Sequence, residues 1–115
     1  MKLVTCNEKI SLDELKAMSE KMFHRIVKAV VDIDKAIMVV DAQMHADQEA
    51  LLLEQDSEQK HLWGINLNPH ASGSDFIEFD SIINFRPDGS NRSRGVDDPA
   101  MQHKIQNIVN NLVIK

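Results

Sequence analysis

The sequence contains one cysteine, no tyrosine, three prolines and four glycines among its 115 residues. The single cysteine, Cys6, cannot form an internal disulfide, so the fold must depend on an apolar core, and this composition fits a reducing cytoplasm. No segment approaches the roughly 18 consecutive apolar residues of a membrane-spanning helix. We therefore expect a cytoplasmic protein that does not enter a membrane.

An excess of basic residues is also missing. The chain has 13 Lys and Arg residues against 18 Asp and Glu residues, which gives a net charge of −5. The stretch from Asp41 to Lys60 contains six acidic residues and one basic residue, so it carries all of this net charge. Because proteins that bind nucleic acids usually present a basic face, we do not expect general nucleic-acid binding.

Length and hydrophobicity are sufficient for one domain with its own core. A chain of 115 residues, of which 43% are hydrophobic, fits a single domain over residues 1–115. Ser11 is a good N-cap for a helix over about residues 12–22. Asp98 and Pro99 are the cap and first residue of a second helix, near the end of the chain.

Alternating or β-branched apolar residues predict the strands. Asp34 and Lys35 divide a valine-rich stretch into the two arms of a β-hairpin. Segment 42–55 has the Ala, Gln, Glu and Leu composition of a helix, but its flanks favour a strand, which we predict there. The predicted strands cover residues 2–6, 26–33, 36–40, 42–55, 63–68 and 76–86.

These elements predict an α+β fold. We expect a two-layer sandwich, with a largely antiparallel sheet of about five strands and one helix near each terminus. Both helices pack most simply on one face of the sheet. The other face would then expose Val and Ile side chains, which favours a homodimer, because an exposed apolar patch usually finds a partner.

The first candidate site is His45-Ala46-Asp47-Gln48-Glu49. In a strand, His45, Asp47 and Glu49 would share one face, whereas in a helix His45 and Glu49 would be neighbours. An imidazole beside carboxylates can act as an acid/base pair or ligate a metal, although a metal normally needs three or four protein ligands. The remaining histidines are scattered, and we expect them at the surface: His24, His61, His70 and His103.

The second candidate site is the segment from Arg86 to Gly95. Its side chains could bind a phosphate or carboxylate through forked donors and amides, and the candidates are Arg86, Asn91, Arg92 and Arg94. An alternative, which we favour, is that Arg92 or Arg94 forms a salt bridge with the acidic residues around Asp47 and Glu49. Such a salt bridge would join the two candidate segments in one polar cluster.

Four short motifs resemble a small family of uncharacterised prokaryotic proteins. They are His45-Ala46-Asp47-x-Glu49, Leu62-Trp63-Gly64-x-Asn66, Ile83-Asn84-x-Arg86-Pro87 and Asn91-Arg92-Ser93. The resemblance runs from about Val27 to Leu112, and the family is a domain of unknown function without an activity, cofactor or catalytic residue to carry over. It implies a prokaryotic, cytoplasmic source. The chain departs from it at Gln55-Asp56-Ser57, where the family pattern is Asp-Gly-Ser, so we expect a less tight turn.

Two functions from different classes follow from these observations. The first, which we favour, is a non-catalytic binding or interaction module that can form a homodimer. The second is a hydrolase or nuclease-type enzyme, with His45 as acid/base, Asp47 or Glu49 as base or metal ligand, and the arginines holding an anionic group. The sequence has no Walker loop, dinucleotide-binding fingerprint or nucleophile elbow, so it names neither a reaction nor a cofactor.

Overall fold

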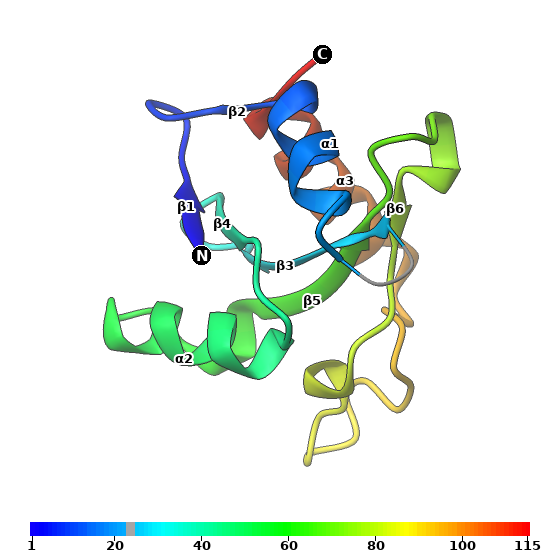
Figure 1. Ribbon diagram of the computed structural model, residues 1–115. Helices are drawn as coiled ribbons and strands as arrows, with labels where there is room; N and C mark the ends of the chain where they lie inside the picture. Colours follow the sequence, from blue (N-terminus) through cyan, green and yellow to red (C-terminus); the bar gives the residue numbers. More distant parts are fainter. Residues whose placement is uncertain (23–24) are drawn as a thin grey trace.

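A five-stranded antiparallel sheet forms the centre of the molecule (Figure 1). The computed structural model describes residues 1–22 and 25–115, so Phe23 and the predicted surface residue His24 lie outside the described part. The sheet order is β1-β4-β3-β5-β6, and a short parallel pair, β2-β7, lies apart from it. The strands are β1 (Lys2–Val4), β2 (Ile10–Ser11), β3 (Val27–Asp32), β4 (Ile37–Val40), β5 (Leu62–Leu67), β6 (Ile77–Glu78) and β7 (Val113–Ile114).

The helices within the described residues are α-helices and short 3-10 turns. They are α1 (Leu12–Ser19), α2 (His45–Glu54), α3 (Pro99–Leu112), η2 (Gln59–His61), η3 (Gly73–Asp75) and η4 (Ile82–Asn84). The predicted α+β class and the antiparallel sheet are confirmed. No helix in the described ranges combines the length and apolar character needed to cross a bilayer.

The predicted β3–β4 hairpin is present, and a buried carboxylate organises its turn. Asp32 Oδ1 accepts hydrogen bonds from the backbone N–H groups of Asp34 and Lys35, at 2.9 and 3.1 Å. The Asp32 carbonyl accepts from the Ala36 N–H at 2.9 Å. Ser57 Oγ donates to the other carboxylate oxygen at 2.6 Å, so all of the polar atoms of this buried side chain have partners.

The helices α1 and α3 pack together on one face of the sheet, as predicted (Figure 1). Both predicted caps are present, because Ser11 Oγ accepts from the Glu14 N–H and Asp98 Oδ1 accepts from the Ala100 N–H. Helix α1 ends at Ser19, earlier than the predicted residue 22. The principal core lies between this helical layer and the side chains of β3, β4 and β5 that face it.

The strand predicted at residues 42–55 is wrong, because His45–Glu54 form α2. Its buried residues His45, Gln48 and Leu52 recur at helical spacing, which a strand cannot present on one face. Helix α2 covers the second face of the sheet, where Leu52 joins a smaller cluster with Val30 and other apolar residues of β4 and β5 (Figure 1). The open apolar face that suggested a homodimer is therefore covered by the chain itself.

The strand predicted at residues 76–86 is mostly absent. Only Ile77 and Glu78 pair with β5, and the chain then turns at Ser81 into η4. Ser81 Oγ caps this turn by accepting from the Ile83 N–H at 3.3 Å. As a result Ile77 packs in the principal core, whereas Ile83 packs in the cluster under α2, so the two do not share one face.

The C-terminal end of α2 is a tight turn, contrary to the expected loosening. Ser57 N–H bonds to the Leu52 carbonyl at 3.0 Å and Asp56 N–H to the Leu53 carbonyl at 3.2 Å, the pattern of a Schellman motif. Asp56 occupies the left-handed position of this motif, with φ of 68°. An L-residue is disfavoured in this conformation, whereas glycine adopts it readily, so Asp56 holds a strained backbone.

We therefore predict that Asp56→Gly raises the free energy of unfolding by about 0.5–1 kcal/mol. Urea unfolding measures the change. Gln55→Gly is the matched control, because Gln55 has φ of −98° and gains nothing from glycine. Equal effects of the two substitutions would contradict the proposed strain at Asp56.

Candidate functional site

The predicted residues His45, Asp47 and Glu49 lie on α2, and the helix separates them. His45 faces the sheet and is only 7% exposed. Glu49, one turn later, is half-buried on the same side, whereas Asp47 is exposed. The strand geometry that would have aligned all three side chains does not occur.

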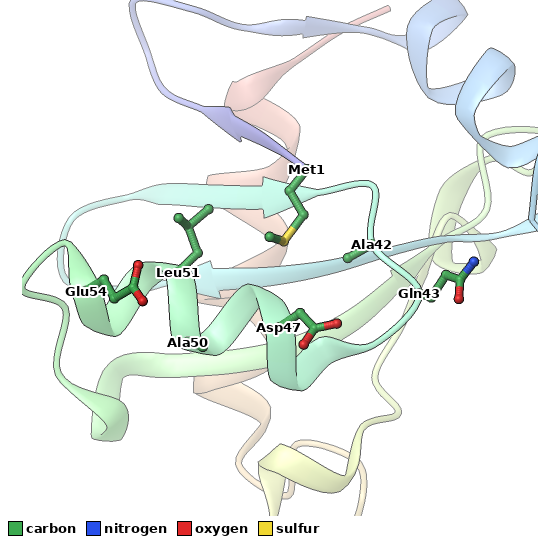
Figure 2. Close-up of a pocket in the computed structure, with 7 residues that line it drawn as sticks. All are labelled: Met1, Ala42, Gln43, Asp47, Ala50, Leu51 and Glu54. Atoms are coloured by element: carbon green, nitrogen blue, oxygen red, sulfur yellow. The ribbon is translucent and has the colours of Figure 1, made fainter.

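Asp47 borders an open groove between α2 and the start of β1 (Figure 2). The groove has a volume of about 480 Å³. It combines the apolar side chains of Met1 and Leu51 with the carboxylates of Asp47 and Glu54, and neither His45 nor any of the predicted arginines lines it. Asp47 is therefore on a different surface from the other candidate residues.

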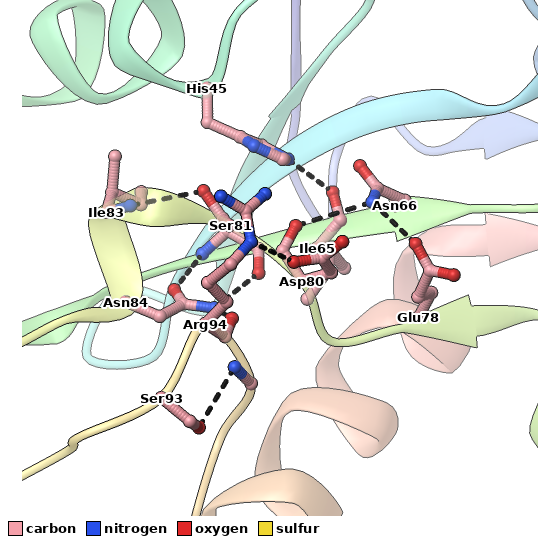
Figure 3. A network of polar contacts seen from close by, with 12 residues as sticks. His45, Ile65, Asn66, Glu78, Asp80, Ser81, Ile83, Asn84, Ser93 and Arg94 are labelled. Atoms are coloured by element: carbon pink, nitrogen blue, oxygen red, sulfur yellow. Dashed lines mark hydrogen bonds and ion pairs between the residues drawn. The ribbon is translucent and has the colours of Figure 1, made fainter.

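His45 is held by the sheet beneath it (Figure 3). Its Nε2 lies 2.8 Å from the carbonyl oxygen of Ile65 in β5. A carbonyl oxygen can only accept, so Nε2 carries the proton and donates, which leaves Nδ1 of the neutral ring as an acceptor. The next buried residue on the helix, Gln48, donates to the Lys28 carbonyl at 2.7 Å, beyond the point where β4 stops pairing with β3.

Burial lowers the pKa of the His45 imidazole below its usual value of 6.5. The hydrogen bond to Ile65 opposes this effect, the positive charges of Lys28 and Arg94 add to it, and Asp80 opposes it. The imidazole is therefore neutral at pH 7. Its environment contains two cations and one carboxylate, each from a different part of the chain.

A small cavity opens beside His45 at the N-terminal end of α2. Its volume is about 180 Å³, and it is lined by Lys28, Gln43, Met44, His45, Ala46, Ile82 and Arg94. The N-cap residue Met44 has no side chain that can accept a hydrogen bond, so the first N–H groups of α2 lack a side-chain cap. The cavity therefore combines two cations with the positive end of a helix dipole.

Arg94 reaches this cavity from the loop before α3. Its Nε donates to Asp80 Oδ1 at 2.6 Å, and both side chains are about half-exposed (Figure 3). The predicted salt bridge to the acidic stretch is therefore wrong: among the described residues neither Arg92 nor Arg94 pairs with Asp47 or Glu49. Arg92 is exposed and lies outside the cavity.

The loop that carries Arg94 is fixed by side chains that complete the outer edge of β5 (Figure 3). Asn84 Oδ1 accepts from the Gly64 N–H at 2.8 Å, and Asn84 Nδ2 donates to the Gly64 carbonyl at 3.0 Å and to the Arg94 carbonyl at 2.8 Å. One amide thus replaces the backbone of a neighbouring strand. Gly64 permits this approach, because a Cβ there would collide with Ser81.

Asn91 and Arg86 support the same loop from within. The buried Asn91 donates to the carbonyls of Asn84, Ser93 and Gly95, and its Oδ1 accepts from the Asp97 N–H. All hydrogen-bonding atoms of this amide are occupied by backbone groups. Asn91 therefore has no free donor for a ligand.

Arg86 is anchored against the sheet. Its guanidinium stacks on Trp63 at 4.0 Å from the ring centroid and donates to the carbonyls of Leu62 and Ile83. Burial lowers its pKa, and the negative charge of Glu49 acts against this. Of the predicted residues, the structure thus brings His45 and Arg94 to one cavity, whereas Glu49 does not line it and acts on Arg86 only through its charge.

The predicted metal-ligand set does not come together. Within residues 1–22 and 25–115, no group of three or more His, Cys, Asp or Glu side chains is arranged to hold a metal ion. His45 faces a carbonyl oxygen with one ring nitrogen, and Asp47 lies on the other groove.

Sequence reasoning missed several residues of the cavity. Lys28 lies in a strand whose apolar neighbours dominate the pattern, and Met44 and Ile82 are apolar residues that the structure leaves 58% and 62% exposed. In the sequence, Asn84 is distinguished only as part of the motif Ile83-Asn84-x-Arg86-Pro87, which assigns it no role. A helix assignment for α2, with Met44 as an N-cap unable to form a cap, would have pointed to this end of the helix.

The sealed edge of β5 predicts a large effect of Asn84→Asp. Asparagine and aspartate have the same shape, but the carboxylate cannot donate to the Gly64 and Arg94 carbonyls. We expect a loss of about 2–4 kcal/mol in the free energy of unfolding at neutral pH. Asn107→Asp, at an exposed position of α3, is the control and should change stability by less than about 0.5 kcal/mol. Equal stabilities of the two variants would show that the Asn84 bridge is unimportant.

The buried imidazole predicts a pH dependence of stability. Because the pKa of folded His45 is below the value of 6.5 that applies to an unfolded chain, the unfolded state takes up this proton first as the pH falls. The contribution of His45 is complete above pH 6.5 and is lost as the pH falls from there through the folded-state pKa. In urea unfolding, the free energy of unfolding should decrease less between about pH 7.5 and pH 5 in His45→Gln than in the parent protein.

His103→Gln is the control, because His103 is exposed on α3. It should keep the pH profile of the parent. An NMR titration of His45 with a midpoint above 6.5 would contradict the assignment of a neutral, buried ring.

Comparison with known proteins identifies the family but not an activity. A family model described as a protein of unknown function (DUF5674) matches residues 4–112. No curated protein and no solved structure matches the chain. Since the family model spans nearly the whole of the 115 residues, the chain belongs to this family of proteins of unknown function.

Proposed function

We propose that the protein is a non-catalytic binding module that holds a small anionic group in the cavity beside His45. The observation that carries this proposal is the convergence of Lys28, Arg94 and the uncapped start of α2 on one cavity. Cationic side chains and free helix N–H groups both favour an anion. The three come from β3, the loop before α3 and α2.

The ion pair between Arg94 and Asp80 leaves Arg94 available to a ligand. Both side chains are about half-exposed, and surface ion pairs contribute only about 0–1 kcal/mol. A bound anion can therefore compete with Asp80 for the guanidinium at little cost. A volume of about 180 Å³ suits one functional group with a short substituent, since sites for drug-sized ligands measure roughly 300–1,000 Å³.

His45 is the third side chain of the cavity that can contribute to anion binding. The residue is more than nine-tenths buried, its Nε2 is occupied by Ile65, and its Nδ1 has no protein partner among the described residues. This nitrogen can donate a hydrogen bond to an anion once the ring takes up a proton there.

A hydrolase or nuclease-type enzyme is the second candidate. In its favour, neutral His45 has the protonation state of a general base and lies on the same cavity as Arg94. The predicted carboxylate partners do not support it, because Asp47 borders the other groove and Glu49 does not line the cavity beside His45. The binding function therefore has the stronger support.

Three further expectations accompany the proposal. Self-association stays a prediction, which light scattering tests. The exposed apolar sheet face that first suggested it is covered by α2. The acidic net charge still argues against general nucleic-acid binding. A cytoplasmic, prokaryotic source stays a prediction, with which the free, exposed thiol of Cys6 is compatible.

Binding of a simple anion should be measurable with isotope-labelled protein. We expect acetate and inorganic phosphate to shift the backbone amide signals of His45 and Ala46 and to raise the pKa of His45, because an anion offsets the charges of Lys28 and Arg94. Arg94→Gln should weaken this binding by about tenfold, which corresponds to 1.4 kcal/mol.

Arg92→Gln is the matched control, since Arg92 is exposed in the same loop but outside the cavity. It should bind as the parent does. If neither anion affects His45 or Ala46, or if the two arginine variants behave alike, the proposed site is wrong.

A further inference from the structure

We propose that the ligand of this cavity is a carboxylate that bears an apolar substituent, held with the carboxylate at the start of α2 and the substituent against Met44 and Ile82. The inference rests on the proposed anion site and adds the chemical class of the ligand. Four features of the cavity carry it: its apolar rim, its uncapped helix, its surrounding charges and the unpartnered nitrogen of His45.

The rim of the cavity is apolar on two sides. Met44 and Ile82 both line it and are 58% and 62% exposed, among the largest exposures of apolar side chains in the described chain. They come from the start of α2 and from η4, elements that are far apart in sequence. Large apolar side chains beside cations suit a ligand that places hydrocarbon next to its charge.

Met44 has a second role at this position. An N-cap is usually Ser, Thr, Asp or Asn, whose side chain would bond to the N–H groups of the first turn. Met44 leaves those groups without a side-chain cap and extends the apolar rim instead. Methionine at the N-cap thus leaves the His45 and Ala46 N–H groups for an anion and supplies a contact for its substituent, while the Asp47 N–H bonds to the Met44 carbonyl at 3.2 Å.

The surrounding charges favour a single negative charge on the ligand. Lys28 and Arg94 provide two positive charges, but Asp80 already pairs with Arg94, and Glu78 accepts a hydrogen bond from the buried Asn66 nearby (Figure 3). Asp47 also lies in the first turn of α2. These carboxylates would repel a phosphate dianion or a polyanion more than a monoanion.

His45 links binding to a proton. Its neutral Nδ1 is an acceptor, so a carboxylate placed against it would require the ring to take up a proton and donate. The charged groups that act on the ring are Lys28 of β3, Asp80 after β6 and Arg94 before α3, and Asp47 and Glu49 lie on its own helix. An anion between the two cations removes part of their effect, so binding should strengthen as the pH falls toward the pKa of His45.

The test compares ligands that differ in charge and apolar content. Binding of acetate, N-acetyl-leucine, N-acetyl-leucinamide and inorganic phosphate is followed by the amide signals of His45 and Ala46. We expect N-acetyl-leucine to bind at least about tenfold more tightly than acetate and phosphate, with proton uptake on binding, and the uncharged amide not to bind. A tetrapeptide ending in leucine with a free carboxylate, compared with N-acetyl-leucine, shows whether the substituent can be a protein C-terminus or is a small acid.

Variants separate the apolar contact from the charge contact. Ile82→Ser should weaken the binding of N-acetyl-leucine much more than the binding of acetate, so that the preference for N-acetyl-leucine is lost. Leu53→Ser is the control, because Leu53 is also exposed, at 42%, near the other end of α2. It should keep the preference.

The outcomes distinguish this inference from the function on which it rests. Equal binding of acetate and N-acetyl-leucine, or tighter binding of phosphate, would overturn the ligand class and leave the anion site standing. Binding of the amide as tightly as the acid would show that charge is not recognised. If none of the four compounds binds, the proposed function fails together with the inference.

Discussion

Beyond its short pairing with β6, the outer edge of β5 is completed by side chains instead of a strand, and the candidate site depends on this. The Asn84 amide satisfies both backbone groups of Gly64 and also holds the Arg94 carbonyl. A sheet edge with unsatisfied backbone groups would be costly inside the protein and a risk for aggregation outside it. Because Asn84 closes the edge at Gly64, the chain after β6 is free to form the loop that brings Arg94 to the cavity beside His45.

Local signals in the sequence were sufficient for much of the fold. The valine-rich arms around Asp34 and Lys35 form the hairpin, since Asp32 binds the backbone of the turn next to it. Ser11 and Asp98 cap their helices through bonds that span only two or three residues. Each of these features is decided by neighbouring residues, which is why a sequence without its structure reveals them.

The errors arose where distant partners decide the structure. Residues 42–55 have helical composition but strand-like flanks, and the sheet face that α2 covers is built from β3, β4 and β5. That assignment also decides the site, because a strand would have aligned His45 with Asp47, whereas the helix aligns it with Gln48 and Leu52. Similarly, the alternation after Ile77 predicts a strand, but Asn84 takes the hydrogen bonds that such a strand would have made. No local sequence pattern predicts that the Asn84 amide bonds to the backbone of Gly64, twenty residues away.

Several polar residues in and beside the predicted anion-binding segment stabilise the fold by bonding to backbone groups. Backbone carbonyls accept hydrogen bonds from the side chains of Asn84, Asn91 and Arg86. Only the remaining polar side chains of the loop can contact a ligand. Amide hydrogen exchange at Gly64 tests this account most directly. If Asn84 seals the edge, the Gly64 amide should exchange as slowly as the strongly protected amides of β3, through global unfolding. Rapid exchange of Gly64 under native conditions, as at an open sheet edge, would contradict the account.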